Sequence, residues 1–333
     1  MRRRPAHAGR LRLRDRFVFT LVFALMATFV VVVMVSSAEA GKLTPHSAAG
    51  TSRTAAAGVT APKAGEGQGG AGPTYQRAQS GGNDRVGRIL RQAKLDKRLT
   101  AALRPVIGDS PARIAVGVID KSTGTEACYQ CGRYLYAGSI IKADILAILL
   151  LQHQQAGTSL TGSEDSLAAQ MIESADASPA ASLLRLAGGE AAIRAANTAL
   201  HLRHTLPRAA RSWGLTSTTV ADQLRLLTDL TAAGSPLHKT ARAYELSLMA
   251  DMQAGRSWGV PAAATGGTSY AVMDAWLAGP RLWDVSSIGV VVHDGQQLLI
   301  AVLSESNPSE AGGIARNQAA AVAAADMITR AGS

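Results

Sequence analysis

The sequence has few charged residues and only two cysteines. Charged residues make up 17% of its 333 positions and apolar residues 47%, so the chain can form a sizeable core and is not disordered throughout. The seven histidines show no paired spacing typical of a metal site, and a zinc site needs more ligands than the two cysteines provide. We therefore expect no metal and no cofactor. No internal repeat is visible.

The net charge of +10 is concentrated at the N-terminus. Residues 1–84 contain 11 Lys and Arg against 4 Asp and Glu, whereas residues 85–333 contain 23 against 20. Nucleic-acid binding requires a basic surface on the folded part of a protein. The charge distribution gives that function little support, and we expect no nucleic-acid partner.

The N-terminal segment has the order of an export signal. Seven arginines precede a 19-residue apolar run, Phe17–Val35, and the small residues of Ser36–Ala40 follow. The run is longer than the core of a usual signal, about 7 to 15 residues, and approaches the roughly 20 residues of a spanning helix. Cleavage after Ala40 and retention as a membrane anchor both remain open. Either way, the positive N-terminus directs the rest of the chain across the membrane, where it is secreted or anchored.

The remaining chain divides into a linker and one domain. Residues 41–83 are rich in Gly, Ala, Ser and Pro without apolar periodicity, which predicts a flexible linker. Residues 84–333 are predicted to form one α+β domain with an all-helical insert at about 139–254 and an antiparallel five-stranded sheet assembled from both chain ends. The predicted helices are 84–103, 140–154, 166–174, 178–186, 189–200, 219–232, 239–252 and 309–330. The predicted strands are 113–120, 126–136, 268–277, 285–292 and 298–303.

Ser139 and Lys142 carry the main chemical signal. Apolar residues occupy nearly every face of the helix that follows Ser139, which predicts burial on all sides. A lysine one turn into such a helix is costly to desolvate unless its amine has partners or a lowered pKa. At this spacing both side chains point the same way, and the combination predicts a nucleophile beside its base. A serine N-cap and a lysine that extends to solvent are the alternative.

The segment Tyr-Ala-Gly-Ser-Ile-Ile-Lys at 136–142, together with the order of elements, resembles the nucleophile region of class A β-lactamases and related penicillin-binding serine hydrolases of an exported actinobacterial type. Further similarity lies at Met171–Glu173, Trp213–Thr216, Ser257–Val260, Ser287–Val290 and Asn307–Glu310.

This resemblance covers roughly residues 85–333 and implies a β-lactamase/transpeptidase-like fold. It implies that Ser139 is the acylated nucleophile and Lys142 its general base, acting on a small molecule such as a β-lactam or on a cell-wall-type peptide. The backbone N–H groups of Ser139 and about Trp276 would form the oxyanion hole.

Other motifs of that family are degenerate in this sequence. The S-D-N position falls on Ala175, Asp176 and Ala177, which lack the hydroxyl and the amide. The K-T-G position falls on Met273, Asp274 and Ala275, which lack the cation that attracts a substrate carboxylate. No acid occurs in Leu202–Ser212, where class A enzymes have the deacylating glutamate. We therefore expect impaired or altered catalysis, with a non-catalytic member that binds a cell-envelope ligand as the alternative.

Cys128 and Cys131 form a C-x-x-C pair within a predicted strand. In an extended strand their Cα atoms would be about 10 Å apart, beyond the roughly 7 Å limit for a bridge. A disulfide, which export permits, therefore requires a turn at Tyr129-Gln130. We expect a local disulfide, with free thiols as the alternative.

Overall fold

The structure is a computed structural model that describes residues 74–108, 110, 112–173, 177–252 and 257–332. The predicted signal or anchor segment and most of the predicted linker lie outside these residues. Within the described ranges, no helix is both long enough and apolar enough to cross a membrane.

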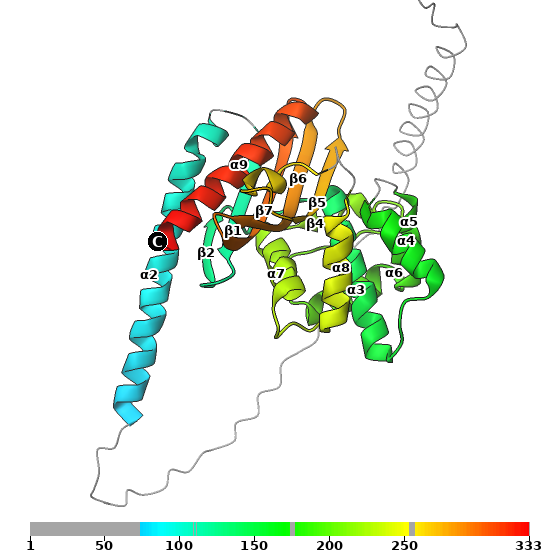
Figure 1. Ribbon diagram of the computed structural model, residues 1–333, viewed down its shortest axis with the longest axis horizontal. Coiled ribbons are helices and arrows are strands. Elements are labelled where there is room, and N and C mark those ends of the chain that lie inside the picture. The colour runs from blue at the N-terminus through cyan, green and yellow to red at the C-terminus, as the bar shows by residue number, and fades with distance from the viewer. Residues whose placement is uncertain (1–73, 109, 111, 174–176, 253–256, 333) are drawn as a thin grey trace, which may run out of the picture. The chain divides into compact units, whose positions relative to one another are not determined.

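A five-stranded antiparallel sheet forms the centre of the domain, in the order β2-β1-β7-β6-β5 (Figure 1). Strands from the N-terminal part of the domain pair with strands from its C-terminal end, as the sequence predicted. The strands are β1 (Arg113–Asp120), β2 (Thr125–Tyr129), β5 (Ala271–Ala278), β6 (Trp283–His293) and β7 (Gln296–Asn307).

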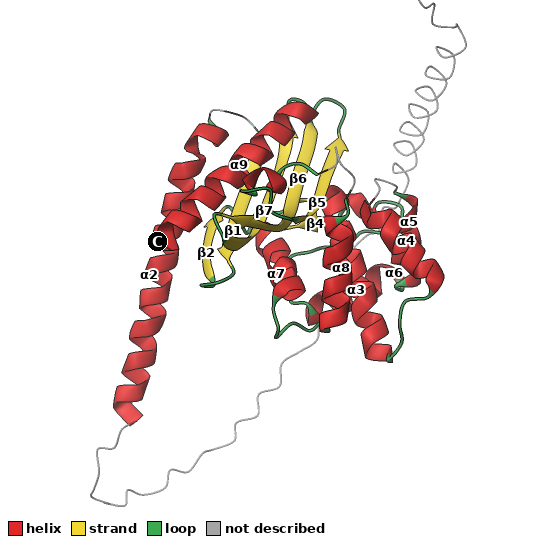
Figure 2. Cartoon of the chain, in the orientation of Figure 1, coloured by secondary structure: helices red, strands yellow, loops and turns green. Residues whose placement is uncertain are grey.

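Two helices, α2 (Thr74–Ile107) and α9 (Glu310–Gly332), cover one face of the sheet (Figure 2). Their contact with the strands is a layer of buried Leu, Val, Ile and Ala side chains that includes Leu99, Val302 and Ala321. The helix α2 begins ten residues earlier than predicted, so the predicted linker boundary at residue 83 is wrong. Extension of a formed helix adds one hydrogen bond per residue, which allows it to continue beyond its packed segment.

A helical layer packs on the other face of the sheet (Figure 2). Its central helix is α3 (Ile141–Ala156), in which eleven consecutive residues from Ile141 to Leu151 are buried. This confirms the prediction of an interior helix. The surrounding helices are α4 (Gly162–Glu173), α5 (Ser178–Leu186), α6 (Gly189–Ala199), α7 (Val220–Thr231) and α8 (Lys239–Ala250). Three short 3₁₀ helices connect them to the sheet: η1 (Gly138–Ile140), η2 (Trp213–Leu215) and η3 (Val260–Ala263).

The predicted strand 126–136 is interrupted in the structure. Its first part is β2, whereas its last two residues form β3 (Leu135–Tyr136), which pairs with β4 (Ser217–Thr218) in a separate two-stranded sheet. The interruption follows from a turn in which Gln130 has a φ of 57°. Cys128 and Cys131 form a disulfide across this turn, with their Cα atoms 5.6 Å apart. The N–H of Ala221 at the start of α7 donates to the carbonyl of Cys131, at 3.1 Å, which ties the turn to the helical layer.

Candidate active site

Ser139 lies in η1, the short helix between β3 and α3. Two features fix this turn against the sheet. The N–H of Ala137 donates to the carbonyl of Thr216, at 2.8 Å. Gly138 has a φ of 57°, and a Cβ at this position would lie 2.8 Å from the Cβ of Ala275 on β5. A glycine is therefore required here by both backbone conformation and space. Ser139 itself is partly exposed, while Gly138 and Ile140 are buried.

Lys142 occupies the first turn of α3 and is 1% exposed. Ile140 and Ile141, the residues between it and Ser139, both have right-handed helical backbone angles. The two side chains therefore lie on the same side of a continuous helical backbone. The Lys142 Nζ also lies 5.8 Å from the centroid of the Trp213 ring on η2, a cation–π arrangement. The ring of Trp213 thus helps to hold the buried amine at this end of the helix.

The strand β5 lies at the edge of the sheet, next to η1. At the β5–β6 hairpin the N–H of Gly279 donates to the carbonyl of Leu282, at 2.8 Å. In an antiparallel pair, alternate residues bond to the partner strand and the intervening ones point away from it. The backbone N–H of Trp276 therefore points toward the open edge of β5. This orientation makes it available as a hydrogen-bond donor to a ligand beside η1.

The side chains of β5 divide between the two faces of the sheet. Ala275 and Leu277 face η1, since both contact the position of a Cβ on Gly138. Trp276 faces away, is 43% exposed and packs edge-to-face against Trp283, with ring centroids 5.9 Å apart. The wall beside Ser139 is therefore formed by apolar side chains and the edge of the strand backbone.

The three residues at the predicted K-T-G position are all buried. Met273, Asp274 and Ala275 are 2%, 9% and 4% exposed. Asp274 accepts a hydrogen bond from the N–H of Trp258, at 2.7 Å, which anchors the segment leading to η3. Burial raises the pKa of Asp274 to about 8, although hydrogen bonds from Ser287 and Trp258 oppose the rise. The burial of Asp274 and its bond to Trp258 therefore give it a structural role, and the triplet contains no cation.

The predicted S-D-N position is only partly described. Ala175 and Asp176 lie outside the described residues. Ala177 precedes α5 as its N-cap and is exposed.

The segment Leu202–Ser212 is held by an acid on the neighbouring helix. Asp222 on α7 is 2% exposed and accepts hydrogen bonds from the N–H of His204, at 2.6 Å, and from the hydroxyl of Thr205, at 3.0 Å. The N–H of Leu206 then donates to the carbonyl of Ser217, at 2.7 Å. The carboxylate of Asp222 is therefore engaged in supporting this segment, which has no acid of its own.

Two further acids lie in the interior of the helical layer, and the sequence reasoning did not identify them. Asp144 follows Lys142 by two residues and accepts a hydrogen bond from the Gln223 side chain, at 3.2 Å. Burial raises the pKa of Asp144 to about 7. Glu245 on α8 is fully buried, and both its carboxyl oxygens lack a hydrogen-bond partner among the described residues. Burial first, and the charge of Asp144 second, raise the pKa of Glu245 well above its usual range. Asp144 was visible as an acid inside an apolar run, whereas nothing in the sequence of α8 shows which face is buried.

Comparison with known proteins shows similarity in structure. No protein-family model matches the sequence, and no curated protein matches it. A β-lactamase from Burkholderia vietnamiensis is 20% identical with a TM-score of 0.58, and the match covers 71% of this chain and 97% of that one. A class A β-lactamase from Bacteroides cellulosilyticus is 13% identical with a TM-score of 0.62, covering 71% and 98%. A mutant of PBP-A, solved as an acyl-enzyme complex with penicillin G, is 15% identical with a TM-score of 0.61, covering 71% and 97%.

At these identities the comparisons show the fold. The matches have TM-scores of 0.58 to 0.62 and cover 97 to 98% of the other chains. The described chain therefore has the α+β fold of class A β-lactamases and PBP-A.

Proposed function

We propose that this chain is a serine hydrolase of the β-lactamase type with impaired or altered catalysis. Ser139 acts as the nucleophile and Lys142 as its general base, on a β-lactam or a cell-wall-type peptide. The observation that carries the proposal is the buried Lys142, placed one helical turn after the partly exposed Ser139. A nucleophile and an adjacent general base are the groups that acyl transfer through a serine requires.

The reaction follows from the positions of these groups. The Lys142 amine accepts the proton of the Ser139 hydroxyl as its oxygen attacks the substrate carbonyl carbon. The N–H groups of Ser139 and Trp276 donate to the oxyanion that forms. When this intermediate collapses, the amide C–N bond breaks, the leaving nitrogen receives the proton that Lys142 accepted from Ser139, and an acyl-serine ester remains.

Deacylation is the step we expect to be slow. It needs a base that activates water, and Leu202–Ser212 contains no acid. Asp222, the acid packed against this segment, is occupied by hydrogen bonds to His204 and Thr205. The apolar wall at Ala275 and Leu277 also disfavours substrates that depend on a cation there. An acyl-enzyme should therefore form slowly and persist.

The second candidate is a non-catalytic protein that binds a cell-envelope ligand in the same cleft. The methyl group of Ala177 and the buried Met273 favour it, since both replace groups that contact substrate in the family the sequence resembles. Either function fits an extracytoplasmic location, secreted or anchored by the N-terminal segment, which the order of charged and apolar residues in 1–40 supports.

The test is intact mass spectrometry of the full chain after incubation with penicillin G. We expect a mass increase of one penicillin that decays slowly, that Ser139→Ala abolishes, and that Ser163→Ala leaves unchanged. Ser163 is an exposed serine on α4 and serves as the matched control. If no adduct forms and Ser139→Ala alters no esterase or amidase rate, the hydrolase proposal fails. Rapid hydrolysis of a chromogenic cephalosporin would instead exclude the non-catalytic alternative.

A further inference from the structure

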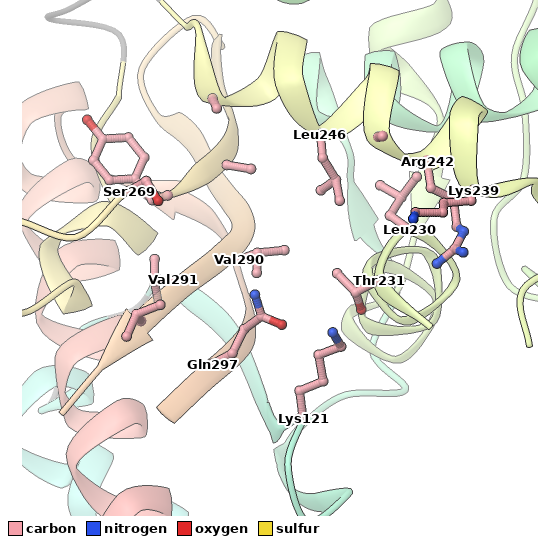
Figure 3. A pocket seen from close by; sticks show the side chains of 15 residues that line it. Lys121, Leu230, Thr231, Lys239, Arg242, Leu246, Ser269, Val290, Val291 and Gln297 are labelled. Carbon is pink, nitrogen blue, oxygen red and sulfur yellow. The ribbon is translucent and has the colours of Figure 1, made fainter. Parts of the chain in front are cut away.

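A pocket of about 350 Å³ lies between the helical layer and the sheet (Figure 3). It is formed where the end of α7 and the outer face of α8 approach the first residues of β5 and the β6–β7 hairpin. Ser139 and Lys142 do not line it. The lining residues are Lys121, Leu230, Thr231, Lys239, Arg242, Ala243, Leu246, Ala250, Ser269, Tyr270, Ala271, Val290, Val291, Val292 and Gln297.

The charge of the pocket is entirely positive. Lys121, Lys239 and Arg242 contribute three cationic side chains, and none of the fifteen lining residues is acidic. These cations come from segments far apart in the sequence, the turn after β1 and the first half of α8. Figure 3 shows Lys121 extending toward Thr231, on the same side of the pocket as Lys239 and Arg242. Like charges placed together without an acid favour an anion between them.

Arg242 has an N–H donor that no described residue accepts. Its Nη1 donates to the carbonyl of Ala232 just beyond α7, at 2.5 Å, which fixes the guanidinium at the pocket wall. Its Nε is buried and has no hydrogen-bond partner in the described part of the chain. A guanidinium carries five N–H donors in a planar fork, and this geometry suits carboxylate and phosphate oxygens.

The rest of the lining is mainly apolar. Leu230, Leu246 and Val290 give the pocket a hydrocarbon wall, while Tyr270 and Gln297 add polar groups at its edge. Its volume falls in the range of about 300 to 1,000 Å³ that small-molecule sites occupy. A ligand that matches both parts needs an anionic head and an apolar body.

We propose that this pocket binds an amphipathic anion, a carboxylate or phosphate monoester on an alkyl or aryl body. Lys121, Lys239 and Arg242 hold the head, and the side chains of α8 and β6 contact the body. Because the lining comes from both the helical layer and the sheet, the bound ligand joins the two layers. A ligand that binds the folded state and not the unfolded state raises the melting temperature, and the rise increases with ligand concentration.

The experiment uses decyl phosphate as the probe, titrated into the full chain below its critical micelle concentration and followed by calorimetry and thermal unfolding. We expect saturable binding and a rising melting temperature. Decanol, which lacks the head, and inorganic phosphate, which lacks the body, should each bind at least about tenfold more weakly, equivalent to about 1.4 kcal/mol.

Variants distinguish binding in this pocket from attraction of the anion by exposed surface lysines in general. Lys121→Gln combined with Lys239→Gln should weaken decyl phosphate binding at least about tenfold, whereas Lys97→Gln, which removes an exposed lysine of α2, should not. Ser139→Ala should bind as tightly as the unaltered chain, since the pocket is separate from the cleft.

Several results would overturn the proposal. One is the absence of saturable binding, and another is equal affinity for decanol or for inorganic phosphate. A third is binding only to vesicles that contain phosphatidic acid, which would indicate a membrane-surface interaction. A fourth is unchanged affinity in the double lysine variant.

Discussion

The two faces of the sheet bury polar groups in different ways. On the α9 side, Asn317 is fully buried, and its Nδ2 lies within hydrogen-bond distance of the Ser304 hydroxyl and the carbonyls of Val285 and Gly313. In the helical layer, Glu245 is equally buried, yet both its carboxyl oxygens lack a partner in the described part of the chain. The amide nitrogen of Asn317 thus secures α9 to the sheet, whereas the carboxyl oxygens of Glu245 secure no element among the described residues.

The buried ionisable groups of the helical layer lie in the same layer as the candidate active site. Lys142, Asp144 and Glu245 all lie in the helical layer, on α3 and α8, within the core on which the Ser139 turn rests. Buried ionisable groups with shifted pKa values gather at functional sites more often than in purely structural cores. Asp144 and Glu245 therefore impose an energetic cost in the layer that carries Ser139 and Lys142.

The largest expected effect is at Asn317. Asn317→Leu removes the donor that connects α9 to the Ser304 hydroxyl and the Val285 carbonyl, so it should lower the free energy of unfolding by about 3 kcal/mol. Chemical denaturation of the full chain measures this change. Arg330→Gln, an exposed substitution on the same helix, is the control and should change it by less than about 0.5 kcal/mol. A neutral result for Asn317→Leu would remove the contrast between the faces.

A smaller effect of opposite sign is expected at Glu245. Glu245→Met replaces an unpartnered carboxyl with an apolar side chain of similar length, and should raise the free energy of unfolding by about 1 to 2 kcal/mol at pH 8. The melting temperature should rise by about 2 to 4 °C per kcal/mol. At pH 3, well below the ordinary glutamate pKa of 4.5, the gain should be smaller, because the wild-type carboxyl is then neutral in both the folded and the unfolded state. Destabilisation at pH 8 would show that Glu245 has a stabilising partner.

The last expected effect is the pH dependence of the unaltered chain. Burial raises the pKa of Asp144 to about 7 and that of Asp274 to about 8 in the folded state. A carboxyl with a raised folded pKa contributes stability that is complete below its ordinary pKa, near 4, and is lost as pH rises through the folded value. The melting temperature should therefore be lower at pH 8 than at pH 5. Asp144→Asn should reduce the slope between these values, and an unchanged slope would contradict the assigned cause.

Much of the fold could be predicted because its signals are local. The apolar run after Ser139 predicted α3, and stretches rich in β-forming residues predicted β1, β6 and β7. The split of the strand 126–136 could not be predicted with the same certainty, because it depends on the disulfide turn and on pairing with β4, about 80 residues away. The start of α2 was missed because its first ten residues have no apolar periodicity.

The candidate site was predictable in part for the same reason. Ser139 and Lys142 are three residues apart, so helical geometry alone relates them. The Trp213 ring beside Lys142 and the buried Glu245 depend on tertiary packing, which the sequence does not show. The basic pocket is a still clearer case, since Lys121 and Arg242 are brought together only by the folded chain.

The most direct test of the central claim is the rate of acylation in Lys142→Met, with the modified peptide identified by proteolytic mapping. The account predicts a penicillin adduct on Ser139 in the unaltered chain and at least about a hundredfold slower formation in the variant, because general-base catalysis contributes about 10² to 10⁴ in rate. Circular dichroism would confirm that the variant is folded. An adduct on another residue, or equal rates in the two proteins, would contradict the assignment of Ser139 and Lys142 as nucleophile and base.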